Sequence, residues 1–113
     1  MIGILPFQSF ALDYLVSSNQ TTLYFDGVPC LITHEWIETY HFDECGDRIT
    51  DYFTSRVTQD CNLRVSTIKF NAVLNANNDV IGISVLDCTG DGCDYSQTTE
   101  FQTEAISILN NYI

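Results

Sequence analysis

The sequence predicts an α+β domain, in which a four- to five-stranded antiparallel sheet carries about three helices. Three observations support this prediction. Segments late in the chain alternate apolar and polar residues, an Asp-Gly pair marks a tight turn, and other segments space apolar residues by three or four. A length of 113 residues fits a single domain, residues 1–113, around one core.

The first expected element is a helix over about residues 8–18, with Ser9 as its candidate N-cap. Its apolar positions are Phe7, Phe10, Ala11, Tyr14 and Leu15. A β-hairpin follows, because residues 22–25 and 28–33 flank Asp26-Gly27. Asp-Gly accepts the positive φ angles of a type I′ turn, which predicts two paired strands here.

Residues 34–42 allow two interpretations. Their Ile, Trp, Thr, Tyr and Phe content favours a strand that continues the hairpin. A helix would instead align His34, Glu38, His41 and Cys45 in one stripe. After a turn at 43–46, Asp47 is expected to cap a second helix that ends near Gln59, with its apolar positions at Ile49, Tyr52, Phe53 and Val57.

The clearest hairpin comes next. Residues 64–74 and 80–86 alternate strictly around a turn at 75–79, so we expect an antiparallel pair with one covered face. Residues 87–96 read as an acidic, glycine-rich loop. Thr99 and Gln102 then form a capping box that predicts the last helix. The inner face of that helix consists of Phe101, Ala105, Ile108, Leu109 and Tyr112.

The cysteines indicate a reducing compartment. Their number, five, is odd, and the apolar start of the chain lacks the basic region of a secretory signal. We therefore expect a cytoplasmic protein with five reduced thiols. Cys88 and Cys93 are the pair that could form a local bridge, because only four residues separate them.

The charge restricts the class of partner. Fifteen Asp and Glu against four Lys and Arg give a net charge of -11. Such a surface repels nucleic acid and anionic membranes, and it attracts basic proteins or cations. Two acidic clusters are the predicted partner-binding residues. They are Asp43, Glu44, Asp47 and Asp51, at the start of the second helix, and Asp87, Asp91, Asp94 and Glu100, before the last one.

No motif predicts a catalytic site, a cofactor or a bound metal. The loop from Asp87 begins like a calcium loop, but Asp94 and Thr98 stand where an apolar residue and a bidentate Glu are required. The stripe from His34 to Cys45 lacks a zinc spacing. No local signature gathers a nucleophile with its base.

The expected function is a non-enzymatic inhibitor that docks on a basic, nucleic-acid-binding partner. Phage anti-CRISPR proteins and nuclease-toxin immunity proteins have a similar size and charge, which is an analogy and not a motif match. Three alternatives remain open. They are a calcium-dependent binding module using residues 87–94, a small hydrolase, and a structural component whose acidity serves solubility.

Overall fold

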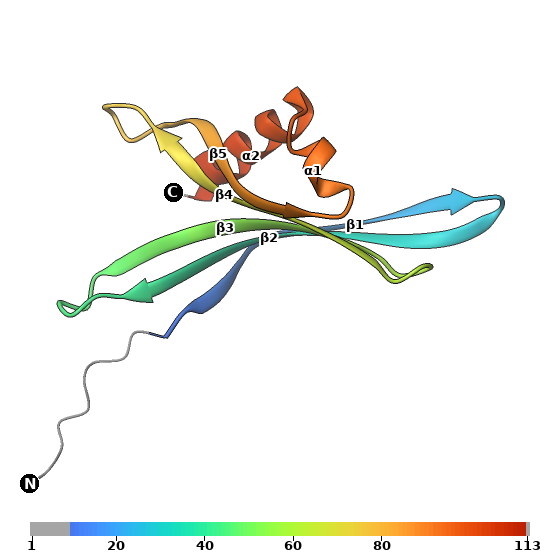
Figure 1. The fold of residues 1–113 in the computed structure, drawn as a ribbon, viewed down its shortest axis with the longest axis horizontal. Coiled ribbons are helices and arrows are strands. Elements are labelled where there is room, and N and C mark those ends of the chain that lie inside the picture. Colours follow the sequence, from blue (N-terminus) through green and yellow to red (C-terminus); the bar gives the residue numbers. More distant parts are fainter. Residues whose placement is uncertain (1–9, 113) are drawn as a thin grey trace, which may run out of the picture.

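The computed structural model describes residues 10–112 as one twisted antiparallel sheet with helices on one face (Figure 1). The strands follow one another in the order β1-β2-β3-β4-β5, each paired with the next. The elements are β1 (Leu12–Phe25), β2 (Val28–Phe42), β3 (Arg48–Gln59), β4 (Arg64–Leu74), β5 (Val80–Thr89), α1 (Gly92–Tyr95) and α2 (Thr99–Tyr112). Among the described residues, no helix has the length and apolar character needed to cross a bilayer.

The predicted α+β class with about three helices was wrong, because two expected helices are strands. The segment expected as the first helix is β1 from Leu12 onward, residues 10 and 11 precede that strand, and residues 8 and 9 lie outside the described residues. The second is β3, the central strand, paired along β2 and β4. Spacings of three and four residues can also arise in a strand rich in Thr, Tyr, Phe and Val, and long-range pairing then decides the structure.

The other predicted strands and the last helix are confirmed, but the loop predicted over residues 87–96 contains the short helix α1. Residues 34–42 are a strand, and Asp26-Gly27 forms the predicted turn with φ angles of 50° and 80°. The hairpin of β4 and β5 is present, although β5 continues to Thr89. The last helix is α2, but its cap is Thr98, whose hydroxyl accepts the Phe101 N–H at 3.2 Å.

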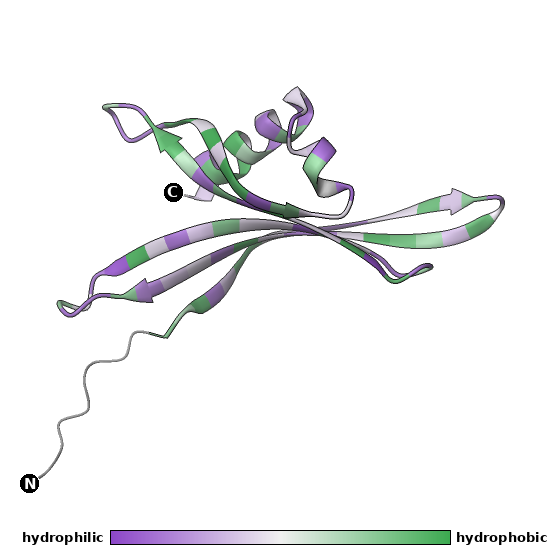
Figure 2. Cartoon of the chain, viewed as in Figure 1, coloured by the Kyte–Doolittle hydropathy of each residue, from purple (hydrophilic) through white to green (hydrophobic). Residues whose placement is uncertain are grey.

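The core lies between α2 and the face of the sheet that it covers. Its centre is aromatic: Trp36 stacks on Phe101 at 5.6 Å between centroids, and Phe70 meets Phe101 edge to face at 5.9 Å. The other buried members are Phe53, Ile68, Val80, Ala105 and Leu109. Apolar and polar residues alternate along the strands (Figure 2), so the opposite face carries mainly polar side chains such as the Glu35–Arg56 ion pair.

The prediction of five reduced thiols was also wrong, because the structure contains two disulfides. Cys30 pairs with Cys61, and Cys88 pairs with Cys93. The first bridge ties the start of β2 to the turn between β3 and β4, where Asp60 also bonds to the main chain of Leu31. Cys45 is free and exposed. An odd count therefore meant one unpaired cysteine and not five.

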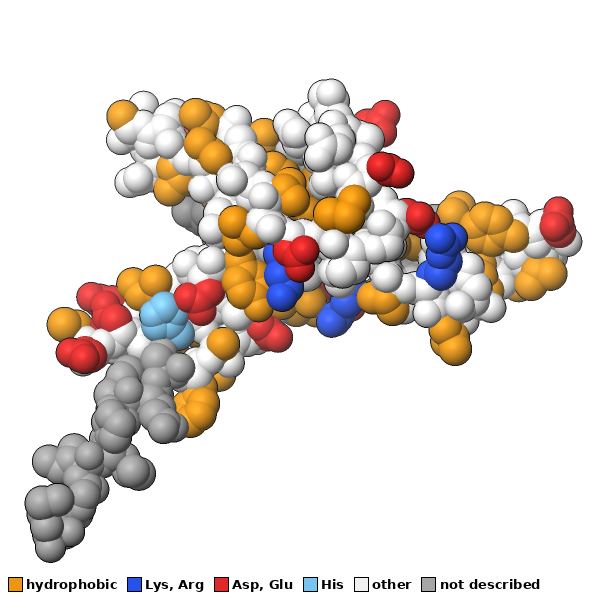
Figure 3. Space-filling view, viewed as in Figure 1, with side chains coloured by type: hydrophobic (Ala, Val, Ile, Leu, Met, Phe, Trp, Pro, Cys, Tyr) orange, Lys and Arg blue, Asp and Glu red, His pale blue; other side chains and the backbone are white. Residues whose placement is uncertain are grey.

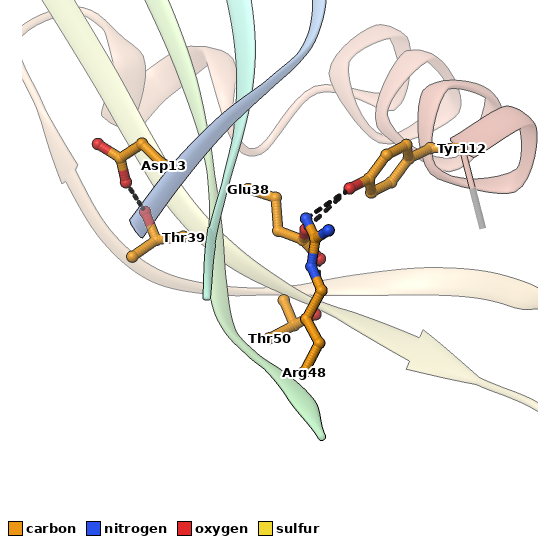
Figure 4. Close-up of polar contacts among 6 residues, drawn as sticks. All are labelled: Asp13, Glu38, Thr39, Arg48, Thr50 and Tyr112. Atoms are coloured by element: carbon orange, nitrogen blue, oxygen red, sulfur yellow. Dashed lines mark hydrogen bonds and ion pairs between the residues drawn. The ribbon is translucent and has the colours of Figure 1, made fainter. Parts of the chain in front are cut away.

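A buried carboxylate fixes the C-terminal end of α2 to the sheet (Figure 4). Glu38, only 4% exposed, accepts hydrogen bonds from Thr50 at 2.7 Å and from the Tyr112 hydroxyl at 2.8 Å, and pairs with Arg48. Burial acts to raise the pKa of Glu38, but these donors outweigh burial and the pKa is lowered. The network therefore requires an ionised Glu38.

We expect Tyr112→Phe to lower the free energy of unfolding by about 1–3 kcal/mol, because Glu38 loses a donor while buried. Burial and the Glu38 charge raise the pKa of Tyr112 to about 12. This tyrosine therefore contributes stability below pH 10 that is lost as the pH rises towards 12. In urea unfolding from pH 8 upward, the free energy of unfolding of the parent should fall as the pH rises. This fall should be smaller in Tyr112→Phe. Equal losses in both would contradict this role.

Candidate functional site

A pocket lies on the helix-bearing face, between the sheet and the α1–α2 region. Its cavity volume is about 480 Å³. Strand residues form its floor, while Tyr95 and Glu104 from the two helices and Asp91 from the loop before them form its wall. The floor residues are Asn19, Thr21, Leu23, Ile32, His34, Ser55, Val57, Gln59, Ser66 and Ile68. Two carboxylates and no Lys or Arg line the pocket, which makes it acidic.

Polar contacts connect the floor of the pocket to its helical wall. His34 Nε2 lies 2.6 Å from Ser55 Oγ, and His34 Nδ1 lies 3.9 Å from Glu104 Oε1. Burial and the negative charge of Glu104 raise the pKa of the Tyr95 hydroxyl. A carboxylate facing Nδ1 favours the proton on that nitrogen, so Nε2 accepts the Ser55 hydroxyl proton. The adjacent β2 and β3 register places His34 and Ser55 on one face.

Burial lowers the pKa of His34, although the negative charge of Glu104 acts in the opposite direction. The neutral imidazole can therefore act as a base. Serine, histidine and glutamate in this order resemble a nucleophile, its base and an orienting acid. Ser55, however, is only 1% exposed, and it pairs with Trp36 on one side and Ile68 on the other. Because the ladders engage the main chain here, β3 offers no free N–H groups for an oxyanion.

The lowered pKa of His34 predicts that the protein loses stability in acid. The unfolded histidine takes up its proton near pH 6.5, whereas the folded one resists until a lower pH. Stability is therefore complete above pH 6.5 and declines as the pH falls through this range. We expect His34→Gln to flatten the decline in urea unfolding between pH 7.5 and 5. His41→Gln is the control, and a decline that survives His34→Gln would contradict the assignment.

The first predicted acidic cluster lies at the far end of the sheet from the pocket, around the β2–β3 turn (Figure 3). Part of it serves the turn: Asp43 Oδ1 accepts the N–H groups of Cys45 and Asp47 at 2.9 and 2.8 Å. Asp51 bonds to His41 at 2.7 Å. Glu44 has no hydrogen bond or ion pair with another described side chain. This cluster borders no described pocket.

The structure divides the second predicted cluster. Asp87 is opposite Lys69, on the sheet face that the helices leave open. Asp91 lines the pocket and pairs with Arg64 at 2.9 Å. Asp94 and Glu100 are exposed on α1 and on the first turn of α2, and they are not part of the pocket lining. Of the four predicted residues, therefore, only Asp91 lines this pocket.

Sequence reasoning missed the pocket itself. It considered His34 only with Glu38, His41 and Cys45 as a zinc stripe, and the structure does not bring that set together: Glu38 binds Arg48 and His41 binds Asp51. Cys30, Asp60 and Cys61 do lie close together, but both sulfurs belong to the disulfide and offer no thiolate ligand. The pairing of His34 with Ser55 was accessible only through the β2–β3 register.

The structure thus offers an acidic pocket with a neutral histidine in its floor. Such a site can hold a positively charged group and can donate or accept hydrogen bonds around it. No family model, curated protein or solved structure matches this chain.

Proposed function

We propose that this protein is a non-enzymatic binding protein whose pocket receives a basic side chain of a partner protein. The observation that carries the proposal is the lining of the pocket, in which Glu104 pairs with no Lys or Arg and Asp91 meets only the exposed Arg64, from outside the lining. A lysine or arginine side chain complements such a lining through charge and hydrogen bonds. The apolar floor residues would contact its methylene groups.

The remaining charged residues of the chain also favour attraction of a basic partner. Each of the three arginines already pairs with a carboxylate of the chain, namely Glu38, Glu35 and Asp91. The single lysine, Lys69, lies over the Tyr52 ring at 4.9 Å. The excess negative charge is therefore free to attract a basic partner and to accelerate its association.

The role that fits this chemistry best is an inhibitor of a nucleic-acid-binding protein, because such proteins expose basic surfaces that bind phosphate. Anti-CRISPR and immunity proteins offer an analogy of size and charge only, because the two disulfides indicate an oxidising compartment. The calcium-dependent alternative loses support, because Asp87 faces away from Asp91 and because Asp91 is paired with Arg64. The serine–histidine pair does not favour a hydrolase, since Ser55 is buried and has no oxyanion donor.

The location of the protein is part of the proposal. A cytoplasmic location was expected from reduced thiols, whereas disulfides persist mainly in oxidising compartments. We therefore propose that the disulfide-bonded form meets its partner in an oxidising environment. Alkylation without reductant of denatured protein from its native source should label only Cys45. Labels on all five cysteines would restore the cytoplasmic location.

Charge neutralisation tests the pocket with an oligoarginine peptide as probe. We expect Asp91→Asn with Glu104→Gln to weaken peptide binding about tenfold, as measured by calorimetry, because two pocket carboxylates lose their charge. Glu44→Gln with Asp47→Asn is the matched control, since it removes the same charge at the other end of the sheet. The control should change affinity by about twofold. Equal losses in both variants would show that binding follows net charge and not the pocket.

A further inference from the structure

β1 is a long edge strand that lacks most of the charged residues and the prolines that normally protect an edge. Its 14 residues contain one charged side chain, Asp13, and neither Lys nor Pro. No described strand pairs with its outer side. The other edge strand, β5, is shorter, has two irregularities in its pairing with β4, and is held at its end by the Cys88–Cys93 bridge. An exposed edge such as β1 is a template for pairing with another strand.

The irregularity near Val16 gives β1 an internal symmetry. Tyr14 is opposite Glu38 and Leu23 is opposite Cys30, and these two β2 residues lie an even number of positions apart. Tyr14 and Leu23 therefore share the helix-bearing face, although an odd number of positions separates them along β1. Without the extra residue at the bulge, the two ends of β1 would present their side chains to opposite faces.

We propose that β1 pairs in antiparallel register with β1 of a second copy of this chain, around a two-fold axis at Asn19. Residues that are opposite each other in an antiparallel pair must share a face. A register centred on Asn19 meets this condition along the whole strand, with Val16 as the bulged residue on each side. The resulting pairs are Asn19–Asn19, Ser18–Gln20, Ser17–Thr21, Leu15–Thr22, Tyr14–Leu23, Asp13–Tyr24 and Leu12–Phe25.

This register also gives favourable side-chain pairs across the interface. Exposed apolar residues at the two ends of β1 meet in the pairs Tyr14–Leu23 and Leu12–Phe25, where the single chain leaves them 49%, 47%, 42% and 51% exposed. The charged residue of the strand, Asp13, is opposite Tyr24 and not its own copy. Like charges are therefore not opposed in the interface, despite the net charge of -11 on each chain.

The dimer would bring two pockets together. Asn19, on the axis, and Thr21, beside it, both line the pocket. Each copy would then contribute its pocket to one continuous concave face, with the axis between them. This inference depends on the edge of β1 and not on the charge chemistry of the proposed function.

Opposed charges test the register directly. In the proposed dimer, position 15 of one copy is opposite position 22 of the other, and both side chains are exposed in the single chain. Leu15→Lys with Thr22→Lys opposes two like charges, whereas Leu15→Lys with Thr22→Glu opposes unlike charges. By light scattering, we expect twice 12.8 kDa for the parent and for the Lys/Glu variant, and 12.8 kDa for the Lys/Lys variant. A monomeric parent, or the same mass for both variants, would overturn the proposal.

A cross-link tests the position of the axis. In a Cys45→Ser background, Asn19→Cys places two thiols opposite each other, so oxidation should link the two copies covalently. Thr21→Cys is the matched control on the same face, because its partner in this register is Ser17. On a gel run without reductant, we expect the monomer band to dominate for Thr21→Cys and the linked dimer band to dominate for Asn19→Cys. Equal cross-linking of both variants would contradict a two-fold axis at Asn19.

Discussion

Phe101→Ala is expected to lower the free energy of unfolding by about 3–5 kcal/mol. Phe101 is fully buried and is the residue of α2 that contacts three other rings, those of Trp36, Phe70 and Tyr95. Alanine would leave a cavity that these rigid rings cannot fill. The aromatic pairings would be lost as well.

The measurement is urea unfolding monitored by tryptophan fluorescence, which reports on Trp36. Gln102→Ala is the matched control, since Gln102 is the next residue of α2 and is exposed. It should leave the free energy of unfolding within about 0.5 kcal/mol of the parent value. A loss below about 1 kcal/mol for Phe101→Ala would mean that α2 does not hold the core together.

Removal of the Cys30–Cys61 disulfide is the second change with a large expected effect. The bridge closes a loop with a sequence separation of 31 residues, for which the chain-entropy model gives roughly 3–4 kcal/mol. Cys88–Cys93 has a separation of only 5 residues, for which the same model gives about 2 kcal/mol. The long-range bridge should therefore contribute more stability.

Replacing both cysteines of one bridge by alanine, and then both of the other, compares the two bridges in the same assay. We expect the urea midpoint to fall further for Cys30→Ala with Cys61→Ala than for Cys88→Ala with Cys93→Ala. Cys45→Ala is the control, since this thiol is free and exposed. A larger effect from the short bridge would show that the unfolded chain is not the state that these bridges constrain.

The hairpin of β4 and β5 could be predicted because apolar and polar residues alternate along most of its length, and this period is typical of a half-buried β-strand. β3 was predicted as a helix because Ile49, Tyr52, Phe53 and Val57 also fit helical spacing. The decisive fact is its pairing on both sides, which depends on β2 and β4 and is not encoded in the local pattern. The C-terminal helix was predictable because its apolar residues have helical spacing and because the polar residues at its start are typical of a helix N-terminus.

The candidate site was only partly predictable for the same reason. Charge indicated acidic residues before the last helix, and one of these residues, Asp91, lines the pocket. His34 and Ser55 meet because adjacent strands place them on one face, and Glu104 reaches them from a helix that packs on that face. No local motif contains these three residues, and pairing of Cys30 with Cys61 depends on the same strand order.

The most direct test of the acidic pocket is to map where a basic ligand binds. Titration of the isotope-labelled protein with an oligoarginine peptide, followed by amide and imidazole resonances, reports each residue separately. Binding in the pocket predicts the largest shifts at His34, Tyr95 and Glu104, with small shifts at Glu44 and Asp47 on the distant turn. Shifts of equal size at both ends of the sheet, or largest at the distant turn, would contradict the pocket as the binding site.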